Sequence, residues 1–397
     1  MDIITLLVDS WNTGFWGSII GWFYEFIGNY GWTIIVFTIA LKLCMLPLDF
    51  FQRRSARKNM QMQKIAQPEL DKIRAKYKDQ PDKMNQKLNE KQMEIFKKHN
   101  YNVMGSCVVM LVNMVLTMVI FFTLFSSLGT IANKQIVNQY EYLNNTYVES
   151  MTESADINLA LSAKELAYLD ANNIAQADIL YNQVIQSGKT EQEASQARQD
   201  YLDKLADDAY LNSILTTGDK DTAQRAVLDL WNSGEVTESW LWVKNVWKGD
   251  TATTSAPTYA EYLQMSGLTK DDLTEAEYTD VMGLVMQEHS GWNGYYILIL
   301  LAGVITVLSQ VVMSGMTKKG EGNKAPMNKF MLIFLPAIMI IFTLSTNAIF
   351  AIYVCMNALL SMIFTPLFNL IFDAMDKHKK KKEENEVIVD YKIQKFN

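Results

Sequence analysis

Five long apolar stretches constrain the fold of this chain more than any other feature. They are Gly31–Phe51, Met104–Leu128, Asn293–Ser314, Phe330–Thr346 and Ala348–Phe372. About 20 apolar residues in a helix cross the hydrocarbon core of a bilayer, and a helix bonds all of its own backbone polar groups there. The sequence therefore predicts an all-α, polytopic membrane protein with five transmembrane helices. Span 1 is placed at 31–51, span 2 at 104–129 and spans 3–5 within 293–372.

The distribution of charge predicts the orientation of these spans. Segment 52–103 carries 14 basic residues against 6 acidic ones, and the tail 373–397 contains the run Lys379–Lys382. Segment 130–292 is the opposite, with 26 acidic residues against 10 basic ones. Because Lys and Arg favour the cytoplasmic side of a membrane, the basic hairpin and tail are expected in the cytoplasm. The N-terminus and the acidic segment are then expected outside.

The segments outside the spans are predicted to be helical as well. Residues 1–30 are expected outside the cell, with an amphipathic helix, Trp16–Ile27, lying in the interface; the alternative is one anchor helix continuous with span 1. Segment 52–103 is expected to form a cytoplasmic helical hairpin that turns at Lys78–Pro81, where the proline opens the second arm. Its apolar seam is too thin for a domain core.

The acidic segment 130–292 is predicted to be an extracellular helical insertion. Helix signals recur over 155–187, 190–215, 219–233 and 274–289, and Thr274 and Glu277 have the spacing of a capping box. The stretch Ser239–Trp247, SWLWVKNVW, is aromatic and amphipathic. It is expected at the outer membrane interface, where tryptophan is enriched.

Lys42 lies near the middle of the first apolar stretch. A charge at the centre of a membrane helix costs about 2.5–3.5 kcal/mol even on the insertion scale, so it is a candidate functional residue. Asp49 lies nearly two turns away and is expected to pair with Arg53 at i+4, which leaves Lys42 without a carboxylate in the membrane. The alternative is a lysine that extends to the inner interface and only anchors its helix. The main prediction is a hydrated groove around Lys42.

Other polar residues recur at helical spacing within the spans and extend this candidate groove. The predicted groove residues are Lys42, Thr38, Asn113, Thr117, Gln310, Tyr353 and Asn357. The alternative for such stripes is hydrogen bonding between neighbouring helices. In the hairpin, the candidate contact residues are Arg53, Arg54, Arg57, Lys58, Lys72, Tyr77 and Pro81.

The sequence contains no pattern typical of catalysis. We find no Ser/His/Asp set and no glycine-rich phosphate loop, and the 3 cysteines and 3 histidines are scattered without metal-ligand spacing. The chain is therefore not expected to be an enzyme, and neither a metal site nor a cofactor is expected. The N-terminus lacks the basic segment and the cleavage site of a signal peptide, so no cleaved signal is expected.

An ordered set of motifs resembles the YidC/Oxa/Alb insertase family. The matching segments are Asn29–Leu48, Gln67–Pro81, Phe96–Cys107, Tyr295–Gln310 and Ile352–Asn357. They occur in the order of the family, and only the set as a whole is specific. Five features depart from the family pattern. Asn113-Met114-Val115 stands where a glutamine-proline pattern is usual, and the second hairpin arm is about one turn longer than usual. Lys42 stands where arginine is usual, Asn102-Val103 where Asn-Pro is usual, and the insertion, mainly Ile131–Glu238, where a short connection is usual.

The resemblance implies a membrane protein insertase and folding chaperone of a bacterial plasma membrane. It would move nascent hydrophobic segments with short polar tails through the groove. The implied partners are nascent membrane proteins, the ribosome and membrane lipids, with no specific nucleic acid sequence, and the Sec translocon is an open question. Two alternatives are a secondary transporter or channel that uses Lys42, and an extracellular binding protein whose acidic segment is the working part. The five spans show no inverted repeat that would favour a transporter.

Overall fold

The protein is described by a computed structural model that covers residues 14–78, 80–99, 101, 103–318, 337–338, 340–344 and 346–396. Within these residues the chain is helical and forms no strand. An isolated bridge between Trp240 and Val243 is the one β-type pairing in the described part. The all-α class expected from the sequence is thus confirmed for the described residues.

The chain divides into two compact units. One contains Ala132–Tyr295 and is called the insertion unit here; the other contains Trp11–Ile131 and Tyr296–Asn397 and is called the span unit. The change of unit within α5 (Val103–Ser154) is not marked by any break in that helix. The sequence placed the insertion at 130–292, close to the bounds of this unit.

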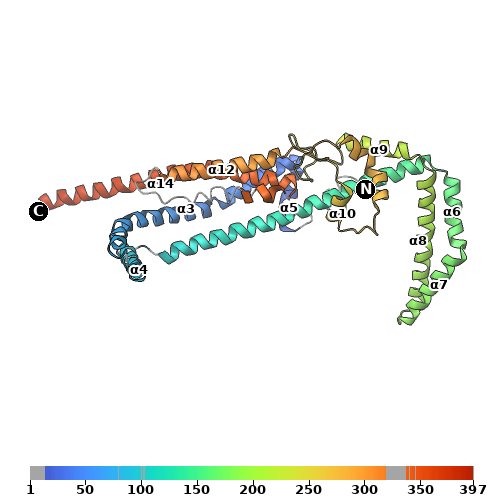
Figure 1. Ribbon diagram of the computed structural model, residues 1–397, viewed down its shortest axis with the longest axis horizontal. Helices are drawn as coiled ribbons and strands as arrows, with labels where there is room; N and C mark the ends of the chain where they lie inside the picture. Colours follow the sequence, from blue (N-terminus) through green and yellow to red (C-terminus); the bar gives the residue numbers. More distant parts are fainter. Residues whose placement is uncertain are drawn as a thin grey trace. The chain divides into compact units, whose positions relative to one another are not determined.

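The span unit holds the helices that are long and apolar enough to cross a membrane. Three candidate spans are found among the described residues, within Tyr30–Lys76, Leu111–Ser154 and Ala348–His378, and a shorter apolar helix covers Ile297–Ser309. The shorter apolar helix is part of α12 (Ile297–Lys318), and the third candidate span is part of α14 (Ala348–Phe396). These two helices pack along one another (Figure 1). The predicted fourth span, 330–346, falls largely outside the described residues, so the number of five spans stays a prediction.

Helix α3 (Tyr30–Lys76) is longer than the sequence suggested. It continues through Pro47 and Pro68 without interruption, so the first predicted span and the first arm of the hairpin are one helix. Its start is fixed by Asn29, whose side chain accepts a hydrogen bond from the backbone N–H of Trp32 at 3.2 Å. Lys78 lies in a turn after α3, and the next helix, α4 (Pro81–Lys98), begins at the proline that the sequence predicted would open the second arm.

Helix α2 (Phe15–Ile27) is separate from α3. It ends at Gly28, which has a φ of 69°, a conformation that glycine adopts without strain. Ile20 is buried, whereas Phe15 and Phe26 are largely exposed. The helix is thus interrupted before the first span, and it presents aromatic side chains on its outer face, as an interfacial helix would.

The insertion unit contains the C-terminal part of α5 and six further helices in the order of the chain. They are α6 (Ile157–Leu169), α7 (Ala171–Gln186), α8 (Glu191–Thr217), α9 (Lys220–Ser233), α10 (Tyr259–Ser266) and α11 (Glu275–Glu288). Both α6 and α7 pack along α8 (Figure 1). The sequence had predicted one helix over 155–187; Asp170 divides it, because its side chain caps the start of α7.

Three helices of this unit start with complete capping boxes. The pairs are Thr190 with Glu193, Thr258 with Glu261, and Thr274 with Glu277. In each pair the threonine hydroxyl accepts a hydrogen bond from the backbone of the glutamate, and the glutamate accepts one from the backbone of the threonine. The box predicted at Thr274 is confirmed.

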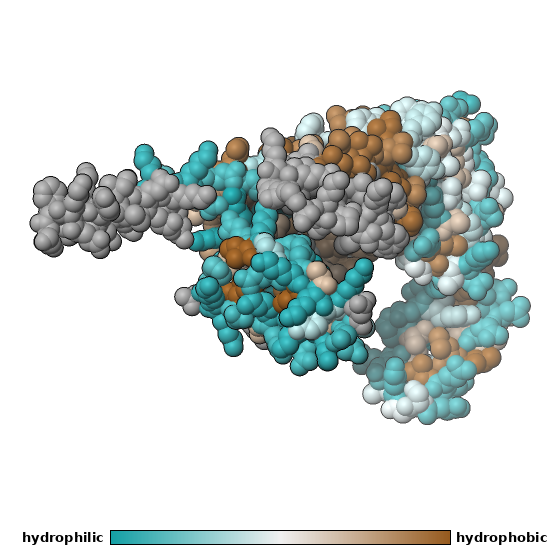
Figure 2. All heavy atoms as spheres, turned by 60° about the vertical axis from the view of Figure 1, so that its left-hand side comes forward, coloured by the Kyte–Doolittle hydropathy of each residue, from teal (hydrophilic) through white to brown (hydrophobic). Residues whose placement is uncertain are grey.

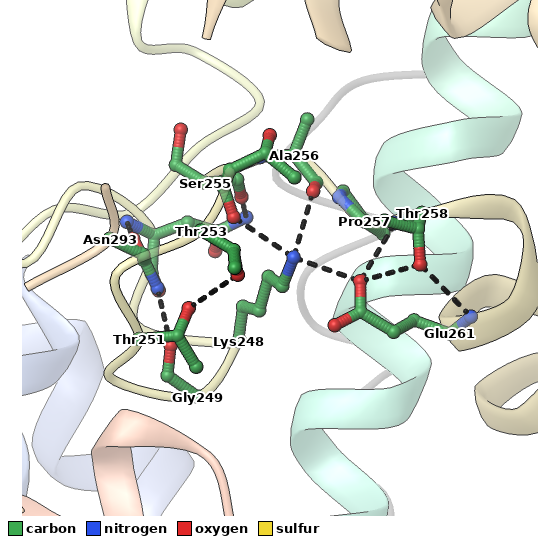
Figure 3. Close-up of polar contacts among 12 residues, drawn as sticks. Lys248, Gly249, Thr251, Thr253, Ser255, Ala256, Pro257, Thr258, Glu261 and Asn293 are labelled. Carbon is green, nitrogen blue, oxygen red and sulfur yellow. Dashed lines mark hydrogen bonds and ion pairs between the residues drawn. The ribbon is translucent and has the colours of Figure 1, made fainter. Parts of the chain in front are cut away.

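The aromatic stretch 239–247 is packed into the insertion unit. Trp240, Val243 and Trp247 are buried. The next residue, Lys248, is only 2% exposed, and its ammonium donates to the carbonyls of Thr254 and Ala256 at 2.9 and 3.0 Å (Figure 3). The expectation that this stretch lies on the membrane interface as an amphipathic segment is therefore wrong for these buried side chains.

Candidate functional site

The candidate site is centred on Lys42, in the apolar part of α3. Its Nζ lies 3.2 Å from Oδ2 of Asp49, and the two side chains are 17% and 15% exposed. The expectation that Lys42 has no carboxylate partner in the membrane, with Asp49 paired to Arg53 instead, is therefore wrong. The four-carbon stem of the lysine reaches the two turns along its own helix that separate the residues. The ammonium is paired and mostly covered, and it keeps some access.

A hydrogen bond next to this ion pair joins α3 to α5. The side-chain N–H of Asn113 donates to Oε1 of Gln52. Asp49 and Gln52 are three apart, so they lie on the same face of α3. Lys42, Asp49, Gln52 and Asn113 are called the polar cluster below.

One polar atom of this cluster has no hydrogen-bond partner among the described side chains. Asn113 is 7% exposed, and its Oδ1 is buried without a donor in the described part of the chain. A buried amide oxygen without a donor costs about 1–3 kcal/mol. Such an atom is suited to accept a hydrogen bond from water or from a passing polypeptide.

The polar cluster lies opposite a broad apolar face of α5. Leu111, Val115, Met118 and Phe122, at i, i+4, i+7 and i+11, are each about half exposed. Asn113 points to the other side of the helix, in line with the buried Leu124. This segment of α5 therefore presents one face suited to lipid and another with a buried amide.

No hydrogen bond between the remaining predicted groove residues and this cluster is found among the described side chains, so their place in a groove stays a prediction. Thr38 is 1% exposed, and its hydroxyl donates to the carbonyl of Ile34 at 2.6 Å, within its own helix. Tyr353 is buried in α14, Asn357 is half-buried, and Thr117 is exposed. The side chain of Gln310 lies outside the described residues. Asp49 and Gln52, which the sequence reasoning left out of the site, take part in the cluster.

The hairpin is held by a thin apolar seam, as its sequence suggests. Ala66 of α3 and Ile95 and Phe96 of α4 are buried, and Lys91 pairs with Glu69 across the two arms at 3.2 Å. Figure 2, in which this side of the molecule comes forward, shows a surface over the hairpin that is mostly hydrophilic. Four of the predicted contact residues are exposed: Arg54, Lys58, Lys72 and Pro81. A fifth, Tyr77, follows α3 directly and is half-buried.

The other two predicted contact residues, Arg53 and Arg57, contact side chains of α14. The guanidinium of Arg57 lies 2.5 Å from Asp373 and 2.9 Å from Asp376, and above the ring of Phe372. The guanidinium of Arg53 lies 5.4 Å from the ring centre of Phe368. Asp373 and Asp376 are three apart in α14 and so share one face of the helix. This spacing in the sequence could have indicated a binding site for an arginine.

The site has no metal-binding character in the described part of the chain. No three His, Cys, Asp or Glu side chains lie close enough there to hold an ion. What the polar cluster offers is a paired ammonium, a carboxylate and two amides, on helices whose other faces are apolar. This arrangement is suited to binding charged or polar chain segments through ion pairs and hydrogen bonds.

Comparison with known proteins shows which families and proteins the sequence of this chain is similar to. The sequence model of a family described as "60Kd inner membrane protein" matches residues 22–199. The chain is 38% identical over 104 residues to the membrane protein insertase YidC of Fusobacterium nucleatum, a match that covers 26% of this chain and 47% of that protein. It is 33% identical over 110 residues to YidC of Wolinella succinogenes, covering 28% of this chain and 19% of the relative. The chain thus spans less than half the length of these curated relatives.

Proposed function

The chain belongs to the YidC/Oxa/Alb family, and on this premise we propose that it inserts nascent hydrophobic segments into a bacterial plasma membrane and assists their folding. Its substrates are segments that carry a short polar tail to the outer side. The observation that carries the proposal is the polar cluster, a partly accessible ion pair with two amides inside an apolar set of helices.

The proposed mechanism uses the polar cluster as a temporary site for the polar tail. Removing a charge from water into hydrocarbon is the main cost of translocating such a tail. An ammonium at Lys42 and the unbonded amide oxygen of Asn113 replace part of the lost hydration. A hydrated groove around them shortens the dry distance that the tail crosses. Thr38, Thr117, Gln310, Tyr353 and Asn357 extend this groove in the proposal.

The apolar part of the substrate then enters the lipid along the exposed faces of the helices. Leu111 and Val115 on α5, for example, expose apolar side chains that can face the lipid. Transfer of an apolar segment from water to lipid is favourable by about 25 cal/mol per Å² of apolar surface. This step therefore requires neither a nucleotide nor a metal.

The hairpin and the C-terminal tail are proposed to receive the substrate on the cytoplasmic side. The exposed basic residues Arg54, Lys58 and Lys72 attract ribosomal RNA or anionic lipid heads. The first arm of the hairpin is one helix with the span that carries Lys42, so a chain that docks there is delivered close to the polar cluster. The N-terminus and the acidic insertion lie outside in this arrangement.

The proposal is tested with purified full-length protein in liposomes. A ribosome-synthesised substrate with one apolar segment and a short acidic tail is supplied, and insertion is measured as protection of the tail from protease. Lys42→Met is expected to lower insertion severalfold, whereas Lys42→Arg retains it because the charge is kept. Lys204→Met, which removes an exposed lysine of α8 in the insertion unit, is the matched control. Wild-type insertion by a folded Lys42→Met protein would contradict the mechanism.

Crosslinking from single positions tests the path of the substrate. A photoreactive side chain at Thr117 is expected to capture the polar tail of a stalled nascent chain. The same group at Val115, on the apolar face of α5, should capture the hydrophobic segment or lipid instead. Equal capture of the tail at both positions would count against a defined groove.

A further inference from the structure

The ion pair in the polar cluster changes what the proposed groove can bind. Lys42 and Asp49 lie 3.2 Å apart and are similarly covered, so the ammonium is already compensated before any substrate arrives. Their mutual attraction exceeds that in bulk water, because partly buried charges are less screened. A substrate carboxylate therefore has to compete with Asp49 for Lys42.

We propose that Asp49 is a specificity-determining residue that lets the groove accept basic tails as well as acidic ones. This inference rests on the proposed function. A carboxylate of the tail binds Lys42 and releases Asp49, while an ammonium or guanidinium of the tail binds Asp49 and releases Lys42. The preferred substrates are polar tails of mixed charge, which satisfy both groups at once.

The surroundings of Asp49 support an exchange of partners. Arg53 lies one turn further along α3 and stacks on Phe368, so a second cation is near when Asp49 leaves Lys42. Gln52, on the same face, is bonded to Asn113 and places two amides beside the pair. Each charge of the pair thus has polar groups nearby when a substrate takes its partner, and neither is left bare in an apolar environment.

The alternative role for Asp49 is structural, as a counter-ion that only allows Lys42 to be buried. The two roles differ in their dependence on substrate charge. A counter-ion that serves folding alone affects all substrates equally when it is removed. A specificity-determining residue changes the order in which acidic, neutral and basic tails are accepted.

The test uses the full-length protein in liposomes without a membrane potential, because a potential would itself act on charged tails. Three substrates share one apolar segment and carry an acidic, a neutral or a basic tail of equal length. Asp49→Asn is expected to raise insertion of the acidic tail about threefold and to lower that of the basic tail by a similar factor, the scale of a partly exposed ion pair. The neutral tail should be unaffected.

Controls separate this inference from the proposed function. Asp373→Asn removes a carboxylate of the same unit that pairs with Arg57, and it should leave the order of the three tails unchanged. If wild-type protein inserts none of the substrates, the proposed function fails. If it inserts them and Asp49→Asn shifts all three tails equally or none of them, the role of Asp49 is refuted.

A second variant keeps the test decisive if Asp49→Asn does not fold. The double variant Lys42→Asp/Asp49→Lys exchanges the two charges and retains the ion pair. It is expected to accept both acidic and basic tails, because both charges are still present in the groove. Loss of the basic tail in this variant would overturn the inference.

Discussion

Replacement of Lys248 by Met should open the insertion unit locally. The ammonium is bonded to the carbonyls of Thr254 and Ala256 and lies 2.8 Å from Glu261 (Figure 3). Methionine keeps the apolar stem and removes all three interactions. Breaking a buried ion pair costs about 3–5 kcal/mol, and Glu261 is 36% exposed, which reduces the penalty on the carboxylate. The expected loss of local stability is therefore about 3 kcal/mol.

Hydrogen exchange on the full-length protein measures this loss residue by residue. The opening free energy of amides within 240–262 should fall in Lys248→Met, while the amides of α3 should keep theirs. Lys220→Met is the control, because Lys220 pairs with Asp280 at the surface and its loss costs less than about 1 kcal/mol. Equal effects of the two variants would refute the reasoning that burial makes the Lys248 interactions strong.

Three further predictions follow from other parts of the molecule. Ser154 and Asp219 are hydrogen-bonded at 2.8 Å, so joining them directly removes α6–α8 with little strain, and such a protein should still insert a short-tailed substrate in the liposome assay. Burial raises the pKa of Tyr262 to about 12 and also raises the pKa of Tyr278. Because an unfolded tyrosine titrates near 10, their contribution to stability is complete below about pH 10 and is lost as the pH rises towards 12, which absorbance of the phenolate together with circular dichroism would reveal. Binding of ribosomes to the hairpin should weaken steeply with salt in co-sedimentation, and replacing Arg54, Lys58 and Lys72 by Gln should flatten that dependence.

Local patterns along the chain predicted much of the helical framework. The start of α4 at Pro81 and the capping box at Thr274 both follow from short-range chemistry that the sequence displays directly. The same Thr-x-x-Glu spacing at Thr190 and Thr258 was equally readable. Helix caps are local, so they need no knowledge of the tertiary structure.

The polar cluster was harder to predict because it depends on reach and on distant partners. A search for ion pairs at i+4 overlooks Lys42 and Asp49, which are seven residues apart and meet through the length of the lysine. The bond between Gln52 and Asn113 joins residues 61 positions apart. No local pattern fixes which face of α5 turns toward α3.

The position of the aromatic stretch 239–247 also depends on tertiary contacts. Periodicity alone made 239–247 resemble an interfacial segment. The side chain of Asn293 donates to the carbonyl of Asn245, and its own oxygen accepts from the backbone N–H of Asn245. These bonds span 48 residues and hold the stretch in the interior of its unit. Burial of tryptophan here reflects long-range packing that composition does not encode.

The unbroken course of α3 connects the two proposed working parts of the molecule directly. A helix of 47 residues is about 70 Å long, more than twice the thickness of the hydrocarbon core. In the proposed function, the place where a substrate docks near Lys76 and the charge of Lys42 therefore belong to one continuous helix. Between these two points, Arg53 and Arg57 hold that helix to α14.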